Sequence, residues 1–394
     1  MLSHDFPSDI VAAATGWRRD FHAHPELGFR EARTSARIAE LLQSFGLEVD
    51  RGLGGTGVVG TLRCGDGPSI GLRADMDALP MQELGEVAHC SVHPGCMHAC
   101  GHDGHSAILL AAAAELARSR RFRGTVHFVF QPAEENLGGA RRMIADGLFE
   151  RFPMQAIYGL HNWPGLPLGQ VAVNPGPMMA SLDTFEVVIN GSGCHAAMPE
   201  RGIDPVVVAT QLVGALQTIV SRRIAATDSA VLSVTRIEAG EAINVIPQTA
   251  SLSGTVRCLQ ESARAEVERL MADMLAHLPE AYGASARFEY RRGYPVTCNH
   301  AAEAGFARDV ALEVVGAPHV TWGCRPSMAS EDFAFMLEAC PGAYLWLGVD
   351  GATPSAALHN PGYDFNDDAI GIGARLWCAL VERALPVDAA AAAG

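Results

Sequence analysis

The chain has 394 residues, of which 48% are hydrophobic and 19% are charged, and its formal net charge at pH 7 is −15. This length predicts two or three domains, because a single domain usually comprises about 100 to 200 residues. The acidic balance and the lack of a basic stripe exclude nucleic acid as the expected partner, because phosphate-backbone binding depends on clustered Lys and Arg side chains.

Hydropathy and cysteine content indicate the cellular location of the protein. The longest apolar segments, such as AILLAAAAELA from Ala107, are shorter than the ~18 residues that a membrane-spanning helix needs. Residues 1–17 lack the basic and apolar regions of a signal peptide. The ten cysteines are scattered without paired spacing, which indicates reduced thiols rather than a disulfide scaffold. We therefore expect a cytoplasmic protein that binds no membrane.

The first third of the chain alternates between helical and strand-like patterns. Apolar residues recur at helical spacing in 35–46, which ends at Gly46, and again in the apolar segment 107–117. The segments with strand-like patterns are GVVGTLRC (57–64), SIGLRADMDALP (69–80) and TVHFVFQ (125–131). Strands that alternate with helices predict an α/β domain with a mixed, mostly parallel sheet. The same rhythm returns near the carboxyl end, with a helix after Ser330 and a strand at AYLWLGV.

The middle of the chain follows a different order. TFEVVIN (184–190) alternates like a half-exposed strand, and the helix after it has Asp204 as its N-cap and Pro205 at its first position. Two strands, a helix and a last strand follow, and this βαββαβ order is the ferredoxin-like pattern. Segments rich in Pro and Gly flank it. We predict a ferredoxin-like domain at 181–291, inserted into a discontinuous α/β domain at 1–180 and 292–394.

Metal-ligand residue types concentrate in the decapeptide CMHACGHDGH (96–105) and in four other stretches. Each of these follows a predicted strand, directly or after a loop: RADMD (73–77), QPAEE (131–135), YGLHNWP (158–164) and ALHNPGYDF (357–365). Ligands bind at the carboxyl ends of strands in open α/β sheets, so these stretches are expected to converge on one crevice. Their joint occurrence favours a metal site, although each residue alone is typical of a cap, a turn or a solvated helix start.

Two other interpretations of the decapeptide are weaker. A structural zinc knot needs a second pair of ligands a dozen or more residues away, and no such pair is present. A redox role for Cys96 and Cys100 lacks the C-x-x-C spacing. The adjacent Glu134 and Glu135 instead suit two tasks, since one carboxylate can bind a metal while the other accepts a proton from a metal-activated water.

Several motifs together resemble the amidohydrolase branch of the aminoacylase and carboxypeptidase metallopeptidases, peptidase family M20. They are RADMDALP, MHACGHDGH, FQPAEE, GLHNWP, GSGCHAAMPERGIDPV, NVIP, SEDFA and LHNPGYDFND. The resemblance extends from RRDFHAHPELGFRE, near residue 18, to about residue 368. It implies a catalytic domain with two divalent metals and a lid domain that mediates dimerisation, hence a homodimer or a tetramer.

The resemblance also implies roles for individual residues. Cys100 matches the ligand that both metals share, and Glu134 matches the general acid and base. Asp77 matches an aspartate that supports the ligands from behind. The remaining metal ligands implied are His102, Glu135, His161 and His359.

Three residues of the predicted inserted domain match positions that act on the substrate. His195 matches a histidine that stabilises the tetrahedral oxyanion in the neighbouring subunit's site. Asn244 and Arg257 match polar groups that face the substrate, and a guanidinium suits the carboxylate of an amino acid. The structural alternatives are a loop histidine and ordinary strand polarity.

Three positions depart from the family pattern. Cys194 stands where glycine is usual before the histidine, Gln248 replaces a frequent acidic residue, and Gly362 replaces a common arginine. All the implied metal ligands keep their residue types, so these departures affect substrate preference rather than activity.

We therefore expect a metal-dependent amidohydrolase that cleaves N-acyl or N-aroyl amino acids to a carboxylic acid and a free amino acid. One alternative is a dipeptidase or carboxypeptidase with the same dinuclear site, and another is a non-catalytic metal-binding or thiol-regulated protein. One thiolate, three imidazoles and a carboxylate suit zinc or manganese, and cobalt or nickel also fit.

Overall fold

The computed structural model describes residues 6–352 and 355–387. The chain divides into two compact units. The larger unit comprises Met1–Gly176, Cys298–Arg325 and Asp332–Gly394, and the smaller comprises Pro177–Thr297 and Pro326–Glu331. The limits expected from the sequence are 180/181 and 291/292. The short segment 326–331 belongs to the smaller unit, where Ala180 donates backbone hydrogen bonds to Ser327 and Ala329.

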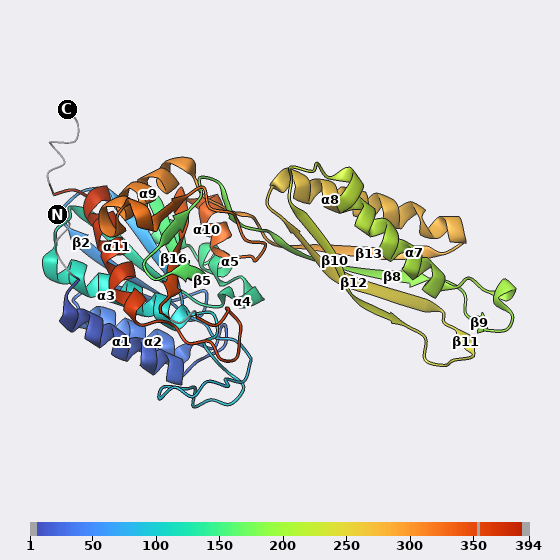
Figure 1. Ribbon diagram of the computed structural model, residues 1–394, viewed down its shortest axis with the longest axis horizontal. Helices are drawn as coiled ribbons and strands as arrows, with labels where there is room; N and C mark the ends of the chain where they lie inside the picture. Colours follow the sequence, from blue (N-terminus) through green and yellow to red (C-terminus); the bar gives the residue numbers. More distant parts are fainter. Residues whose placement is uncertain (1–5, 353–354, 388–394) are drawn as a thin grey trace. The chain divides into compact units, whose positions relative to one another are not determined.

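An eight-stranded mixed sheet forms the centre of the larger unit, which confirms the predicted α/β class (Figure 1). Its central strands pair in parallel, β4 with β3, β3 with β5, and β5 with β16, while β1, β2 and β6 make antiparallel pairs. In spatial order the strands are β1 (Glu48–Leu53), β2 (Gly57–Cys64), β4 (Gly124–Gln131), β3 (Ser69–Asp75), β5 (Ala156–Pro167), β16 (Gly342–Asp350), β6 (Val171–Val173) and β15 (Val320–Trp322).

Helices cover both faces of this sheet. Alternate strand residues such as Tyr158, Leu160 and Leu345 enter one core with α1 (Ser8–Ala23), α2 (Ala32–Ser44), α3 (His102–Ser119), α9 (Ala301–Val315) and α11 (Asp368–Ala384). Tyr344 points to the opposite face and packs on Phe333 of α10. The short helices of the larger unit are α4 (Glu134–Leu137), α5 (Gly139–Ala145), α6 (Leu148–Arg151), α10 (Phe333–Ala339) and the 3-10 turn η4 (Ala317–His319).

Helix α3 is the central helix of the larger unit. It is buried around most of its circumference, as its Ala- and Leu-rich sequence requires. It begins at His102, directly after Gly101, which takes a left-handed conformation with φ of 91°. A Cβ at Gly101 would lie 2.4 Å from the side-chain oxygen of Asn162, so this close approach requires glycine.

The smaller unit has a four-stranded antiparallel sheet in the order β10-β12-β8-β13, with α7 and α8 packed on it (Figure 1). The chain order is βαββαβ, and Asp204 caps α7 ahead of Pro205 as predicted. The elements are β8 (Leu182–Asn190), α7 (Pro205–Thr218), β10 (Ala230–Ala239), β12 (Thr249–Cys258), α8 (Glu261–His277) and β13 (Ser285–Tyr294). The minor elements are β7 (Pro177–Met179), β9 (Cys194–His195), η1 (Pro199–Arg201), η2 (Ile219–Arg223), β11 (Val245–Ile246), η3 (Pro279–Tyr282) and β14 (Thr297–Cys298).

Two further predictions concern disulfides and membrane-spanning helices. The structure pairs none of the ten cysteines in a disulfide. Within residues 6–352 and 355–387, no helix has both the length and the apolar character needed to cross a membrane.

Candidate metal centre

The parallel strands bring three of the predicted ligand stretches to one edge of the sheet. Asp75 at the end of β3 lies opposite Gln131 at the end of β4, and Arg73 lies opposite Gly159 of β5. The residues that follow these positions therefore meet at the carboxyl ends of the strands, where ligands bind in α/β sheets. The segments holding Asp77, Glu135 and His161 converge as the sequence pattern predicted.

Cys100 belongs to two groups of potential metal ligands. One group is Cys100, His102 and His161, and all three residues are buried. The other is Cys100, Glu135 and His359. Within each group the ligand atoms all lie within 4.8 Å of one another. The thiol of Cys100 is therefore placed to serve two ions, and its Sγ lies 3.5 Å from Nε2 of His161.

The imidazoles of His102 and His161 turn one nitrogen toward this space. Nδ1 of His102 lies 2.9 Å from the carbonyl oxygen of Asp77, and Nδ1 of His161 lies 2.7 Å from that of Asn162. Each Nδ1 therefore carries the hydrogen, and Nε2 is the remaining nitrogen. In the described part of the chain, Nε2 of His102 is buried and has no hydrogen-bond partner. A buried polar nitrogen without a partner is costly, and a bound cation would satisfy it.

The charges around the cluster also fit a cation. Burial, followed by His105, lowers the pKa of His161 well below its usual value, so this ring is neutral and can donate a lone pair. Burial lowers the pKa of His102, but Asp75 and then Cys100 raise it well above its usual range. Burial and Glu135 raise the pKa of the Cys100 thiol, so a thiolate here requires a neighbouring cation. The residues present thus fit divalent metal ions.

The adjacent glutamates make different contacts. Oε1 of Glu135 lies 3.2 Å from Nε2 of His359, and the backbone N–H of Glu135 donates to Asp77 at 3.0 Å. Glu134 is buried, and its Oε1 accepts a hydrogen bond from the backbone N–H of Asp332 at 3.3 Å. The two carboxylates also form a third candidate group with His102. Glu135 therefore contacts His359 of the ligand set, while Glu134 lies close to His102 and accepts a hydrogen bond from Asp332.

His359 reaches the cluster from a separate loop. Its side chain is 52% exposed, its φ is 62°, and its backbone N–H donates to the carbonyl of Ala99 at 2.8 Å. Hydrogen bonds to Cys100 and Glu135 raise the pKa of His359 to about 10. The loop that carries His359 thus supplies the most exposed member of the ligand set.

Asp75 and His105 form a buried pair beside His102; Asp75 lies in the predicted ligand stretch 73–77 and His105 in the decapeptide, but neither was predicted as a site residue. Nδ1 of His105 lies 2.6 Å from Asp75, and the pair forms a buried candidate group with His102. Burial raises the pKa of Asp75, but His102 and Arg73 lower it well below its usual range. The signal was present in the sequence, since residues three apart on a helix share a face, as His102 and His105 do.

The predicted substrate-contacting residues lie in the smaller unit. His195 is exposed on β9, and its Nδ1 accepts a hydrogen bond from the backbone N–H of Ala197 at 3.1 Å, so Nε2 carries the hydrogen. Asn244 is exposed, and its carbonyl accepts from the backbone N–H of Ala196 at 3.0 Å. Arg257 is half-buried on β12 and donates to the hydroxyl of Ser330 at 3.0 Å.

The three residues that depart from the family pattern each contact neighbouring groups in the structure. The side-chain amide of Gln248 donates to the carbonyl of Gly191 at 2.7 Å, and its oxygen accepts from the backbone N–H of Gly193 at 3.0 Å. An acidic residue would lack the amide donor. Cys194 packs tightly on Gly202, where a Cβ would lie 2.6 Å from the sulfur. Gly362 donates its backbone N–H to the side chain of Asn360 at 2.8 Å.

Comparisons with known proteins agree with this geometry. Residues 71–383 match the model of Peptidase family M20/M25/M40. The chain belongs to this family. It is 40% identical over 369 residues to a hippurate hydrolase of Campylobacter jejuni, a match that covers 93% of this chain and 95% of the relative. It is 38% identical over 366 residues to an N-acetylcysteine deacetylase of Bacillus subtilis, covering 92% and 94% of the two chains.

The M20 fold is also seen in solved structures. One is a Bacillus subtilis protein described as a dinuclear metal binding peptidase of the M20 family, with a TM-score of 0.85 and 35% identity. The similarity covers 96% of this chain and 99% of that one. Membership of the M20 family identifies the chain as a hydrolase of amide bonds, which disfavours the non-catalytic alternative.

Glu31 supports the turn that precedes Glu134. It is fully buried, and its two oxygens accept hydrogen bonds from the backbone N–H of Ala133 at 2.9 Å and from the hydroxyl of Thr56 at 2.6 Å. Ala133 has a φ of 54°, an unfavourable conformation for alanine that these contacts help to hold. Burial raises the pKa of Glu31 from 4.5 to about 7.

Stability should therefore depend on the protonation of Glu31. Because the folded-state pKa is raised, the stabilising contribution is complete below pH 4.5 and is lost as the pH rises to about 7. We expect wild type to lose about 3 kcal/mol of unfolding free energy relative to Glu31→Gln across this interval. Urea unfolding of both proteins at several pH values measures the difference. The exposed Glu40→Gln is the control, and a pH-independent difference for Glu31→Gln contradicts the assignment.

Proposed function

We propose that the protein hydrolyses the amide bond of N-acyl and N-aroyl amino acids, such as hippurate or N-acetyl amino acids, to a carboxylic acid and a free amino acid. The observation that carries this proposal is the buried thiol of Cys100, shared by two ligand groups, with the carboxylate of Glu134 beside them. The relatives named hippurate hydrolase and N-acetylcysteine deacetylase support this substrate class.

The proposed centre holds two divalent ions. The ligands are Cys100, His102, Glu135, His161 and His359, with Cys100 common to both ions and Asp77 supporting His102 and Glu135. Such ions polarise a carbonyl and lower the pKa of water. Zinc or manganese suits this mixture of sulfur, nitrogen and oxygen donors, and cobalt or nickel is compatible with it.

Glu134 performs the proton transfers in this proposal. Its carboxylate accepts a proton from the attacking water and then donates it to the leaving nitrogen of the amide. The hydrogen bond from the backbone N–H of Asp332 to Oε1 helps to hold the carboxylate in place. Burial keeps bulk water away from this exchange.

Residues of the smaller unit complete the proposed site. His195 can donate its Nε2 hydrogen to the oxyanion, because Nδ1 is already an acceptor. Arg257 suits the carboxylate of the amino acid, and Asn244 offers an amide to the substrate. We assign to this unit the roles of lid and dimerisation domain, and His195 then serves the neighbouring subunit.

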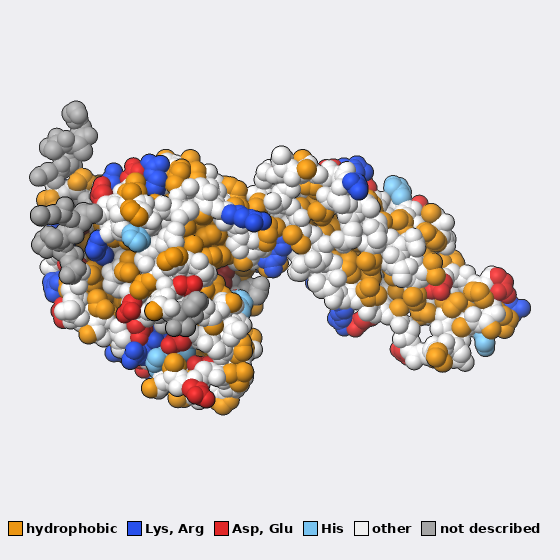
Figure 2. Space-filling view, viewed as in Figure 1, with side chains coloured by type: hydrophobic (Ala, Val, Ile, Leu, Met, Phe, Trp, Pro, Cys, Tyr) orange, Lys and Arg blue, Asp and Glu red, His pale blue; other side chains and the backbone are white. Residues whose placement is uncertain are grey.

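Exposed apolar side chains support the proposed homodimer. Hydrophobic groups lie at the surface of the smaller unit (Figure 2), and β10 is an edge strand that exposes Val231 and Ile237. Unpaired edges and apolar surface of this kind are typical of interfaces. We also propose a cytoplasmic location, consistent with ten reduced cysteines.

A substrate panel tests the proposed reaction. We expect N-benzoylglycine and N-acetyl amino acids to be hydrolysed with higher kcat/KM than unblocked dipeptides of the same amino acids. The free amino acid released is measured after the metal content of the protein has been determined by elemental analysis. A preference for unblocked dipeptides would make the protein a dipeptidase and overturn the proposal.

The two neighbouring glutamates should respond differently to the same change. Glu134→Gln removes the proton acceptor but keeps the oxygen that receives the Asp332 hydrogen bond, so kcat should fall about 10²- to 10⁴-fold with both metals retained. Glu135→Gln should lower metal affinity instead. Elemental analysis and steady-state kinetics separate the two effects. The exposed Glu150→Gln is the control, and near-normal turnover in Glu134→Gln contradicts the assignment of the base.

His195→Ala should lower kcat about 10²- to 10³-fold, the usual effect of removing one oxyanion donor, with metal content unchanged. His277→Ala provides the matched control, because His277 is an exposed histidine of the same unit. Both variants are compared with wild type on N-benzoylglycine. If His195→Ala behaves like His277→Ala, His195 is an ordinary loop histidine.

A further inference from the structure

Two buried residues of α1, Arg18 and His22, have no place in the proposed chemistry. They lie one helical turn apart, and their exposed fractions are 1% and 0%. Charged side chains are rarely buried unless they are paired. Their contacts converge on carboxylates from three other segments of the larger unit, and two of those segments carry proposed metal ligands.

Arg18 joins the start of α3 to the loop after His359. Its guanidinium contacts Asp364 at 2.6 Å and Asp367 at 2.7 Å, and it lies 3.5 Å from Asp103. Asp103 directly follows His102 in the chain, and Asp364 is five residues beyond His359. One rigid, planar cation thus adds a charged connection between two segments that also meet where Phe365 packs against Gly104.

His22 extends this network to a third segment. Its Nδ1 lies 2.8 Å from Asp103 and its Nε2 lies 3.2 Å from Glu83. Burial lowers the pKa of His22, but Asp103 and Glu83 raise it to about 10, so the ring is charged at neutral pH. Next to Glu83, the backbone N–H of Leu84 donates to the carbonyl of Pro361 at 2.8 Å, which supports the His359 loop again.

His359 is the proposed metal ligand whose loop this network contacts. His359 has a positive φ, and its side chain is half-exposed. Cys100, His102 and His161 are buried among strands and helix α3, so their positions follow from the core. The position of His359 depends on its loop, and Arg18 contacts that loop through two carboxylates.

We propose that Arg18 and His22 are positioning residues that clamp the His359 loop to the first turn of α3, and that they set the affinity for the ion bound by His359. This inference rests on the proposed dinuclear centre. The clamp acts through Asp364, Asp367 and Asp103 and touches neither substrate nor metal. Its loss should weaken one ion selectively, because the other ion keeps its buried ligands. Outer partners of metal ligands typically change affinity by about 10- to 100-fold.

The test is a stepwise metal titration of protein freed of metal by a chelator. Co²⁺ binding is followed by visible absorption, and hydrolysis of N-benzoylglycine is measured in parallel. His359→Ala shows which of the two binding steps needs His359. We expect Arg18→Gln to weaken the same step about 10-fold or more, and to leave the other step within about threefold of wild type.

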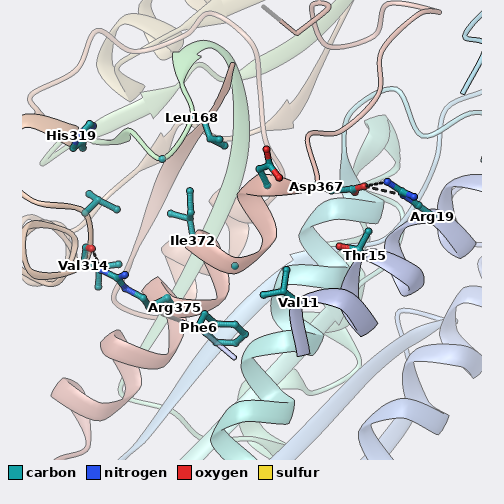
Figure 3. Close-up of a pocket in the computed structure, with 14 residues that line it drawn as sticks. Phe6, Val11, Thr15, Arg19, Leu168, Val314, His319, Asp367, Ile372 and Arg375 are labelled. Carbon is teal, nitrogen blue, oxygen red and sulfur yellow. Dashed lines mark hydrogen bonds and ion pairs between the residues drawn. The ribbon is translucent and has the colours of Figure 1, made fainter. Parts of the chain in front are cut away.

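Arg19→Gln is the matched control. Arg19 is the next residue and contacts the other oxygen of Asp367 at 2.8 Å, but its side chain is 53% exposed. It lies at the wall of a surface hollow of about 650 Å³, where the ion pair with Asp367 is visible (Figure 3). Arg19→Gln removes a contact to the same carboxylate without reaching Asp103 or Asp364. It should leave both binding steps unchanged.

Asp364→Asn keeps the inference testable if Arg18→Gln fails to fold. Asp364 is partly exposed, and Arg18 would keep Asp367 and Asp103 as partners, so this variant should fold and still weaken the His359 step. The proposal is overturned if the folded variants bind both ions like wild type or weaken both steps equally. Equal weakening would indicate a purely structural role. Failure of wild type itself to bind two ions would contradict the proposed function instead.

Discussion

The parallel register of β3 with β4 and β5 is the constraint on which the rest of the site depends. Parallel strands end at the same edge of a sheet, so the residues after Asp75, Gln131 and Gly159 must approach one another. A shift of one residue in this register would turn each side chain to the opposite face. The buried, β-branched and aromatic residues of these strands prevent such a shift, because both faces of the sheet are covered.

The start of helix α3 contributes to the candidate metal centre at that edge. His102 in its first turn and Cys100 just before it lie at the strand ends, and Gly101 allows the backbone to pass against Asn162. The apolar body of α3 is buried in the core, which holds this turn rigidly. Hydrophobic packing thus determines the position of the segment that carries two of the proposed metal ligands. The loop with His359 is held both by the buried side chains of Tyr363 and Phe365 and by charged contacts to α1.

Local patterns predicted some features well. The cap at Asp204, the βαββαβ order and the strand that ends at Asp75 follow from side-chain type and period, and the structure has each of them, whereas His161, expected after a strand, lies within β5. Other features were missed. The strands β1, β6 and β15 are short or largely exposed, so their sequences carry little periodic signal. The pairing of Arg18 with Asp364 was not predictable, because it joins residues 346 positions apart.

The sequence by itself determined the family, the α/β class and the set of residue types that can bind metal, because these depend on local composition, spacing and ordered motifs. The roles of the individual site residues stay predictions. Only the tertiary structure decided that Cys100 lies in two ligand groups, that Asp75 and His105 form a buried group with His102, and that α1 connects α3 with the His359 loop. Those relations arise from contacts between distant segments, and packing rather than sequence period selects which distant side chains meet.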